Sequence, residues 1–344
     1  MRTLIIGQGL AGSTLALELL SRGEEVRIID SPNPNTSTSV AAGLINPVVL
    51  KRMNLVWRAD EFMEHQTKFY SNWSQELNTS WFQNTQVYRR FASVHEQNQW
   101  SEFSEKAIFN RYLDPKILDV PEHIEGAFGM GRVIGAGWFN TNAFLQTCRD
   151  YFISLDIFNE CEWDYEQDKG GLQSLIDGSP NAQVVFCDGA GARHNSLFPE
   201  DAIRPSKGEL LRIRAKREIG FEGIIKAGVF VLPIGNSEFR VGATYDHHDL
   251  SEGISEKGQH YLENQLDKIF AVPYEILDRE WGIRPTTKDR RPILGKHPDQ
   301  SGVYFFNGLG SRGVLMAPLL AKELCELMLK GKALRPDVNV NRFF

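Results

Sequence analysis

The sequence predicts an α/β protein in which a doubly wound parallel sheet is accompanied by a second domain built on an antiparallel sheet. Two observations lead to this fold class. At the N-terminus, the apolar run 3–6 enters the glycine turn 7–12, a helical pattern follows to residue 21, and a second apolar run occupies 25–30. This order is typical of the first βαβ unit of a doubly wound, Rossmann-like sheet. In the middle of the chain, short segments alternate apolar and polar residues, as antiparallel strands with one solvated face do.

Size and composition are those of an ordinary globular protein. The 344 residues suffice for two domains, and 42% of them are hydrophobic against 24% charged. With 38 basic and 44 acidic residues the net charge is −6. We therefore expect no global attraction to nucleic acid or to an anionic membrane.

The cysteines and the apolar segments predict the compartment. The four cysteines are widely spaced and form no C-x-x-C pair, which suits buried thiols in a reducing environment. No apolar run approaches the roughly 20 residues that span a bilayer. We expect a cytoplasmic protein with no membrane partner.

The N-terminal turn predicts a dinucleotide site. Gly7 allows the tight turn, Gly9 lets the backbone approach a pyrophosphate, and Gly12 lets the helix pack closely on the strand. The pyrophosphate would then sit at the positive end of the helix. Asp30 lies 18 residues after Gly12, near the offset of about 20 expected for an acid that binds ribose hydroxyls. Together these residues predict that an adenine dinucleotide binds here.

Hydrophobic periodicity and turn residues predict the other elements. A loop at 31–39 and small residues at 40–47 precede a helix at 58–77, a strand at 87–92, a helix at 100–112, extended segments within 126–139 and a helix at 141–152 capped by Asn140 or Thr141. A buried strand with a small-residue turn at 182–191 precedes strands at 208–214, 228–233 and 239–244 and helices at 257–270 and 314–330.

Near residue 83 the sequence changes from a helical pattern to segments that alternate apolar and polar residues, which indicates two discontinuous domains. We expect the cofactor domain to comprise residues 1–82, 140–205 and 276–344. The substrate domain, an inserted antiparallel sheet, would comprise residues 83–139 and 206–275.

Two late segments carry residues suited to a ligand site. In W-G-I-R-P at 281–285, the neighbouring Gly and Pro fix the backbone of Arg284. Residues 305–313 run from an apolar strand into a glycine turn that opens a helix, so that N–H groups again point at a ligand. A reduced flavin is negatively charged near N1 and O2, and the positive end of a helix would stabilise it there.

These segments together resemble the D-amino acid oxidase superfamily of FAD enzymes. The motifs that carry the resemblance are the glycine turn 7–12, the loop 39–47, D-G-A-G at 188–191, G-I-R-P at 282–285 and the turn 308–313. V-A-A-G at 40–43 and G-A-T at 242–244 look more like glycine oxidase. The turn 308–313 looks more like the FAD domain of the bifunctional enzyme that finishes 5-methylaminomethyl modification of the tRNA wobble uridine.

The resemblance implies oxidation of a carbon–nitrogen bond. A small amine or amino acid would be held with its α-C–H over flavin N5, hydride would pass to the flavin, and oxygen or another electron acceptor would reoxidise it. Arg284 matches the family's carboxylate-binding arginine, a bidentate fork for a planar anion. Arg312 is either a second substrate-side arginine or a flavin contact. Tyr245 lies where the family has substrate-side groups.

The implied cofactor is FAD. We expect it to bind non-covalently, because some relatives attach FAD through a cysteine just after the Arg-Pro position, where this chain has Thr286 and Thr287. The expected cofactor residues come from the glycine turns, the acid after the second strand and the small-residue loop: Gly7, Gly9, Leu10, Ala11, Gly12, Asp30, Ser39, Ala41, Ala42, Gly43, Leu44, Gly189, Ala190, Gly191, Gly308, Gly310, Ser311, Arg312, Gly313 and Val314.

Two other functions stay open. A stand-alone oxidase that removes a carboxymethyl group from the tRNA wobble uridine is favoured by the 308–313 motif and disfavoured by the acidic net charge. A protein that only binds FAD and a partner is disfavoured by the presence of Arg284. The sequence D-H-H-D at 246–249 looks like metal ligands, but adjacent residues on a strand point to opposite faces. We predict a solvated loop and no metal.

Overall fold

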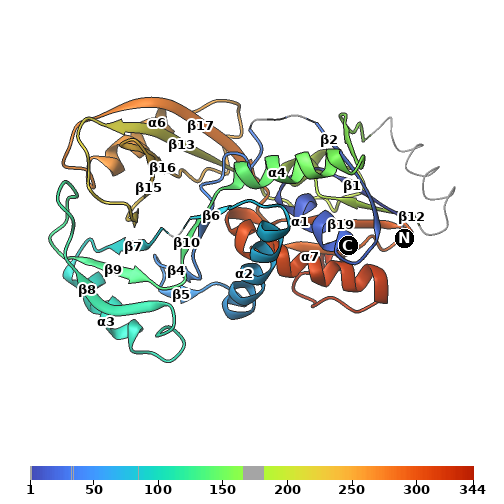
Figure 1. Cartoon of the computed structure of the whole chain (residues 1–344), viewed down its shortest axis with the longest axis horizontal. Coiled ribbons are helices and arrows are strands. Elements are labelled where there is room, and N and C mark those ends of the chain that lie inside the picture. Colours follow the sequence, from blue (N-terminus) through green and yellow to red (C-terminus); the bar gives the residue numbers. More distant parts are fainter. Residues whose placement is uncertain (1, 32, 34, 84, 166–181) are drawn as a thin grey trace.

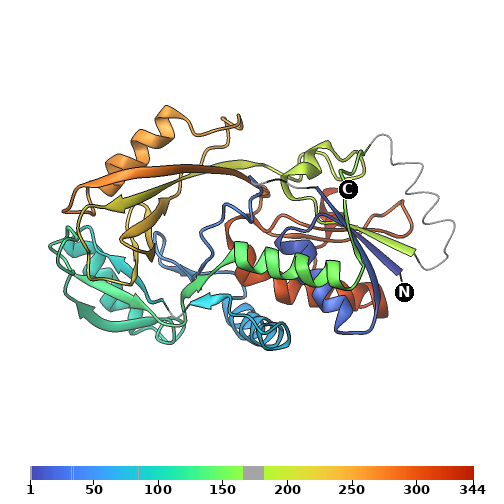
Figure 2. The same cartoon turned by 45° about the horizontal axis from the view of Figure 1, so that its top comes forward.

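The computed structural model describes residues 2–31, 33, 35–83, 85–165 and 182–344. A six-stranded sheet and an eight-stranded sheet occupy opposite halves of the molecule (Figure 1, Figure 2). Both chain termini lie in the half that contains the six-stranded sheet (Figure 1). The chain passes between the halves more than once, so each half is assembled from separated segments.

The six-stranded sheet has the order β11-β2-β1-β12-β19-β18, and only β18 is antiparallel to its neighbour. Its strands are β1 (Arg2–Ile6), β2 (Glu25–Asp30), β11 (Phe158–Glu160), β12 (Ala182–Phe186), β18 (Ile293–Lys296) and β19 (Val303–Asn307). From β1 the chain moves outward to β2 and β11, and it returns to β12 and β19 on the other side of β1. The order therefore reverses between β1 and β12, where doubly wound sheets bind ligands.

The helices of this half fix the end of the glycine turn. They are α1 (Leu10–Leu20), α2 (Ala59–Glu76), α4 (Thr141–Ser154) and α7 (Gly313–Lys330). Leu15, Leu17 and Leu19 of α1 are fully buried in one cluster with Ile5 of β1 and Leu320 of α7. Burying three leucines stabilises the unit by several kcal/mol, about 2 kcal/mol for each side chain. The N-terminus of α1 is thereby held beside the end of β1.

The eight-stranded sheet has the order β17-β13-β16-β15-β14-β7-β9-β8 and is antiparallel apart from the β14–β7 pair. Its strands are β7 (Val87–Arg90), β8 (Leu113–Leu118), β9 (Met130–Val133), β13 (Ser206–Ala215), β14 (Ile224–Lys226), β15 (Phe230–Gly235), β16 (Glu238–Gly242) and β17 (Tyr274–Arg284). Helix α6 (Glu256–Leu266) covers one face, where Leu262 and Leu266 pack with Leu211 and Val241 of the sheet. Helix α3 (Val94–Ser104) lies beside β8.

Short elements connect the two halves. A three-stranded sheet contains β3 (Leu44–Ile45), β10 (Gly137–Phe139) and β6 (Phe82–Gln83), and a two-stranded sheet contains β4 (Val48–Val49) and β5 (Asn54–Leu55). Three 3-10 turns are η1 (Gly189–His194), η2 (Gly310–Arg312) and η3 (Val340–Phe343). β3, η1 and η2 all border the cleft described below.

The predicted fold class is confirmed, and one helix needs correction. The helix predicted at 100–112 runs instead over α3, because the Ser93 side chain accepts a hydrogen bond from the Glu96 N–H and so starts the helix earlier. The extended segments predicted within 126–139 are confirmed as β9 and β10, which belong to different sheets. Asn140 is the cap of α4, with its side chain accepting from the Ala143 N–H at 3.0 Å.

The domain boundaries stay a prediction. Residue 276, proposed as a boundary, falls inside β17, an edge strand of the eight-stranded sheet. In the described part of the chain, no helix is long and apolar enough to span a bilayer.

Candidate functional site

A cleft of about 800 Å³ lies between the two sheets. One wall is formed by the turn after β1, the turn after β12 and the turn after β19, all at the carboxyl ends of parallel strands. Strands of the eight-stranded sheet form the opposite wall. The cleft therefore begins at the point where the strand order reverses, as expected for a ligand site in this architecture.

The three glycines of the N-terminal turn have different structural roles. Gly7 has a φ of +100°, and a Cβ there would come within 2.7 Å of the Cys187 carbonyl oxygen. A Cβ on Gly12 would overlap the Gly7 carbonyl oxygen, which explains the close approach of α1 to β1. A Cβ on Gly9 would meet only the Thr38 hydroxyl, at 3.5 Å. Gly9 therefore keeps space open in the cleft itself, as a pyrophosphate cradle requires.

Asp30 is held by two neighbours at the end of β2. Its carboxylate accepts a hydrogen bond from the Gln8 N–H at 3.0 Å and from Nη2 of Arg149 at 2.9 Å. Burial nevertheless raises the pKa of Asp30. Arg149 also donates to the Gln8 side chain, so the acid, the turn and α4 form one unit. Asp30 lines the cleft, where a carboxylate can accept from ribose hydroxyls.

A buried amide shapes the turn after β12. Asn307, at the end of β19, donates to Oδ1 of Asp188 and to the Gly189 carbonyl, both at 2.9 Å. The Tyr165 hydroxyl donates to the other carboxylate oxygen of Asp188. Burial raises the pKa of Asp188 to about 6. Two neighbouring parallel strands are thus locked together where both meet the cleft.

Arg312 stands at the start of the last helix and lines the cleft. Its Nη1 donates to the Asn46 carbonyl at 2.6 Å, and in the described part of the chain no carboxylate pairs with it. Burial lowers the pKa of Arg312 to about 10. The residue lines the cleft beside the turn at Gly310, whose φ is +57°.

Arg284 is the second such cation. It ends β17, and its Nη1 donates only to the carbonyl oxygens of Lys207 at 3.3 Å and Thr244 at 3.2 Å. Among the described residues it has no carboxylate partner, and burial lowers its pKa. A Cβ on Gly208 would collide with the guanidinium, so this glycine provides the space that Arg284 fills.

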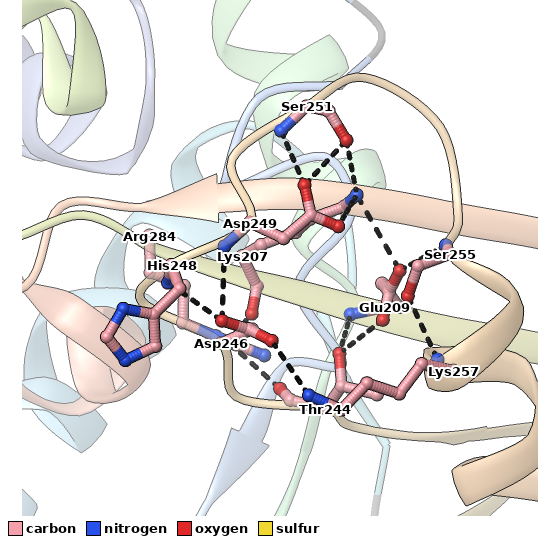
Figure 3. A network of polar contacts seen from close by, with 11 residues as sticks. Lys207, Glu209, Thr244, Asp246, His248, Asp249, Ser251, Ser255, Lys257 and Arg284 are labelled. Atoms are coloured by element: carbon pink, nitrogen blue, oxygen red, sulfur yellow. Dashed lines mark hydrogen bonds and ion pairs between the residues drawn. The ribbon is translucent and has the colours of Figure 1, made fainter.

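A polar network supports the backbone around Arg284 (Figure 3). The Lys207 side chain is only 1% exposed and pairs with Glu209 at 3.7 Å and Asp249 at 3.3 Å. The Thr244 hydroxyl donates to Glu209 at 2.9 Å, while the Thr244 carbonyl accepts from Arg284. The charge of Lys207 is therefore already balanced, and that of Arg284 is not (Figure 3).

Tyr245 covers Arg284 from the solvent side. The guanidinium carbon lies 5.2 Å from the centre of the tyrosine ring, within the range of a cation–π contact. The ring also meets His247 edge-on at 5.0 Å, and Tyr245 is 46% exposed. In the described residues no group of three His, Cys, Asp or Glu side chains is arranged to hold a metal ion, the segment 246–249 included.

The structure brings most of the predicted site residues to one cleft. All three predicted catalytic residues, Arg284, Tyr245 and Arg312, line it. So do the predicted cofactor residues, except Gly12, Ser39 and Gly308. Gly12 packs against the Gly7 carbonyl, a Cβ on Gly308 would press on Thr287, and the Ser39 hydroxyl bonds to Thr36. These three shape the walls of the cleft without facing it.

Sequence reasoning missed several residues that line or support the cleft. Thr38 accepts from the Leu10 N–H at 3.2 Å and ties the loop to the start of α1. Arg149, which orients Asp30, comes from a helix far away in the sequence. Lys226 lies at the end of β14 and faces the cleft. A lysine that closes the apolar run I-I-K was a visible signal for this last residue.

The cleft fits an FAD molecule, because Gly9 leaves open space at the start of α1 and an acid stands at the end of β2. The family model of FAD-dependent oxidoreductases named DAO matches residues 2–327. The chain belongs to this family. The protein is accordingly an oxidoreductase, and its cofactor is FAD.

Relatives support the predicted resemblance. Glycine oxidase of Bacillus subtilis is 22% identical over 352 residues, covering 94% of this chain and 92% of that protein. The tRNA 5-methylaminomethyl-2-thiouridine biosynthesis bifunctional protein of Marinobacter nauticus is 24% identical over 353 residues, covering 94% of this chain but 54% of its own length. The structure of iminodiacetate oxidase from Chelativorans sp. BNC1 superposes with a TM-score of 0.77 at 19% identity, covering 99% and 98% of the two chains. The resemblance to the D-amino acid oxidase superfamily is confirmed, and the structural likeness shows the same fold.

Proposed function

We propose that this oxidoreductase acts on the carbon–nitrogen bond of a small amine or amino acid that carries a carboxylate beside the reacting carbon. One observation carries the proposal: Arg284 presents a guanidinium to the cleft, and among the described residues no acid neutralises it. A planar, permanently charged fork of this kind matches the geometry of a carboxylate.

The residues around the cleft would orient the substrate. Arg284 would hold the carboxylate through two parallel hydrogen bonds, and Gly208 and Thr244 keep its guanidinium in position. Tyr245 shields this contact from water on one side, which strengthens the charge-assisted bonds. The FAD supplies the acceptor for the hydride that leaves the α-carbon. The protein therefore contributes the position of the substrate and the positive charge that binds its carboxylate.

The names of the relatives agree with this substrate class. Glycine oxidase and iminodiacetate oxidase are each named for a compound with an amine one carbon away from a carboxylate. We propose that Arg284, Arg312 and Tyr245 form the substrate side and that the lining glycines hold a non-covalent FAD. Purified protein should be yellow and should release intact FAD on acid denaturation. Flavin that stays with the precipitate would contradict the non-covalent part.

A screen for oxidation tests the proposal. FAD-loaded protein is mixed with glycine, sarcosine, D-amino acids, proline and iminodiacetate, and both hydrogen peroxide and the reduction of an artificial dye are measured. Turnover of at least one amino acid with either readout is expected. Peroxide formation would make oxygen an acceptor, whereas dye reduction alone would indicate another electron acceptor. No turnover with any of them would reject the small-substrate assignment.

The second candidate is an oxidase of carboxymethylaminomethyl-uridine in tRNA. It is favoured by the bifunctional relative, which is named for tRNA modification. This substrate also carries a secondary amine beside a carboxylate, so Arg284 would serve it equally. Activity on modified tRNA combined with inertness toward free amino acids would choose this candidate.

A further inference from the structure

A third cation faces the cleft from the same eight-stranded sheet as Arg284. Lys226 ends β14, and its Nζ lies 5.3 Å from the centre of the Phe230 ring. In the register of the sheet, Lys226 stands between Arg89 of β7 and Phe230 of β15. In the part of the chain that the structure describes, no acid pairs with it.

Two arginines, Arg89 and Arg312, lie close enough to Lys226 to affect its pKa. Arg89 is neutralised by Glu96, with Nη2 at 2.8 Å and 2.9 Å from the two carboxylate oxygens. Among the described residues, Arg312 makes no such pair and donates only to the Asn46 carbonyl. Burial and the positive charges of Arg312 and Arg89 lower the pKa of Lys226 to about 8. Two cations thus share this part of the cleft, and no carboxylate among the described residues pairs with either.

An uncompensated pair of partly buried cations is costly, and sites of this kind are typically completed by an anionic ligand. The Arg284 side of the cleft already accounts for the substrate carboxylate beside the amine. Glu96 binds Arg89 and Asp249 binds Lys207, so neither acid is available to Lys226. An anion that arrives with the substrate or with the cofactor would complete the Lys226 side.

We propose that the substrate carries a second acidic group, and that Lys226 with Arg312 binds it while Arg284 binds the carboxylate next to the amine. This inference rests on the proposed function and names its substrate class: a small amino diacid, with a carboxylate or phosphonate on the far side of the nitrogen. The two anchors fix both ends of the molecule and place the carbon–nitrogen bond between them.

The spacing of the anchors limits the length of the diacid. β17 and β14 are separated by β13, β16 and β15. Neighbouring strands lie about 4.8 Å apart, so the two backbones are about 19 Å apart. Side chains stand roughly perpendicular to a sheet, so the lengths of the two side chains do not shorten this separation directly. The Arg284 guanidinium lies over Gly208 of β13, however, and the Lys226 amine lies near the Phe230 ring of β15. β16 lies between these two strands, so the anchors are on the order of 10 Å apart, a gap that a secondary amine with one acid on each side can bridge.

Binding of unreactive ligands tests the proposal independently of any reaction. Oxydiacetate has two carboxylates and an ether oxygen in place of the amine, and methoxyacetate has one carboxylate. Isothermal titration of the FAD-loaded protein should give at least a tenfold lower Kd for oxydiacetate. Lys226→Met should remove this preference, and Lys226→Arg should retain most of it. Lys116→Met, which removes an exposed lysine of the same sheet outside the cleft, should leave the preference unchanged.

The turnover of substrates with and without a second acid provides the second test. For iminodiacetate, N-(2-carboxyethyl)glycine and N-(phosphonomethyl)glycine, Lys226→Met should lower kcat/KM by about 30-fold or more, a typical loss for one buried charge-assisted contact. For sarcosine, which lacks the second acid, the change should stay within about threefold. The series also shows which length and which acid the Lys226 side prefers.

Three results would overturn the proposal. The first is equal binding of the two ligands to the unchanged protein, or binding of neither. The second is an equal loss for both ligands in Lys226→Met. The third is a loss of FAD content or a shifted flavin spectrum in that variant, which would assign Lys226 to the cofactor. Failure of the oxidase assignment is distinguishable, because it removes turnover with every amine and leaves the oxydiacetate preference intact.

Discussion

The glycine-turn end of the cleft (Gly7, Gly9, Gly12 and Asp30) is formed mainly by backbone, whereas the cation end (Arg284, Arg312 and Lys226) is formed by charged side chains. At the first end, two glycines are fixed by packing within the protein and one keeps the cleft open. At the second end, three charges meet the cleft and none has an acidic partner among the described residues.

The difference separates what a cofactor needs from what a substrate needs. A large dinucleotide is bound by many backbone N–H groups and needs space free of side chains, so an added side chain should weaken its binding more than a changed charge. A small acid is bound by a few charged side chains, so the loss of one charge should weaken its binding more than a small change of volume. Each prediction below changes one end and asks whether the other responds.

The largest effect is expected at the glycine-turn end. Gly9→Val should lower FAD affinity more than 100-fold while the apoprotein stays folded, because the new side chain enters the cleft and meets little else. Gly12→Ala should instead destabilise the fold by about 2 kcal/mol or more, since its Cβ overlaps the Gly7 carbonyl. Flavin absorbance and thermal unfolding separate the two outcomes. Full flavin content in Gly9→Val would show that the pyrophosphate lies elsewhere.

A smaller effect is expected from moving a cation without removing it. In Gly208→Ala the new methyl group displaces the Arg284 guanidinium, so KM for a carboxylate substrate should rise by about tenfold with FAD content unchanged. Gly137→Ala is the matched control, because a Cβ on that strand glycine would have its nearest atom 3.7 Å away. An unchanged KM in Gly208→Ala would mean that the position of Arg284 does not matter to binding.

The last effect is a pH dependence at the cation end, of about the same size as the effect of Gly208→Ala. Lys226 has a lowered pKa of about 8, set by burial and by Arg312 and Arg89. The free protein therefore loses this charge between about pH 7 and pH 9, and oxydiacetate affinity should fall about tenfold over that interval. Arg312, with a pKa of about 10, loses its charge only at higher pH, and Arg89 is paired with Glu96. The affinity for methoxyacetate should not change over this pH interval. If the affinities for both ligands fall in parallel with pH, the charge of Lys226 does not explain the effect.

The two ends also differ in how far the sequence predicts them. The glycine-turn end is nearly contiguous, so spacing alone predicts β1, α1, β2 and the cleft position of Asp30. The cation end is assembled from β14, β17 and the start of α7, which are far apart in the chain. Arg284 and Arg312 were reached through the resemblance, because each lies in a family motif.

Lys226 was not predicted, since it lies in no motif and only the sheet order brings it to the cleft. The start of α3 was missed for a different reason: a local hydrogen bond at Ser93 decides it, and hydrophobic periodicity does not register such a bond. Local patterns predict elements, while sites built across a sheet depend on strand order.

The central claim is that Arg284 binds the carboxylate of an amine substrate. Anaerobic mixing of FAD-loaded protein with substrate, followed by the loss of flavin absorbance, measures this directly. For an amino acid, Arg284→Ala should lower the reduction rate constant per substrate concentration by about 30- to 3,000-fold, and Arg284→Lys should recover only part of it. For a matched amine without a carboxylate, the same variants should change the rate far less. Equal losses for both substrates at unchanged flavin content would contradict the account and remove Arg284 from the substrate site.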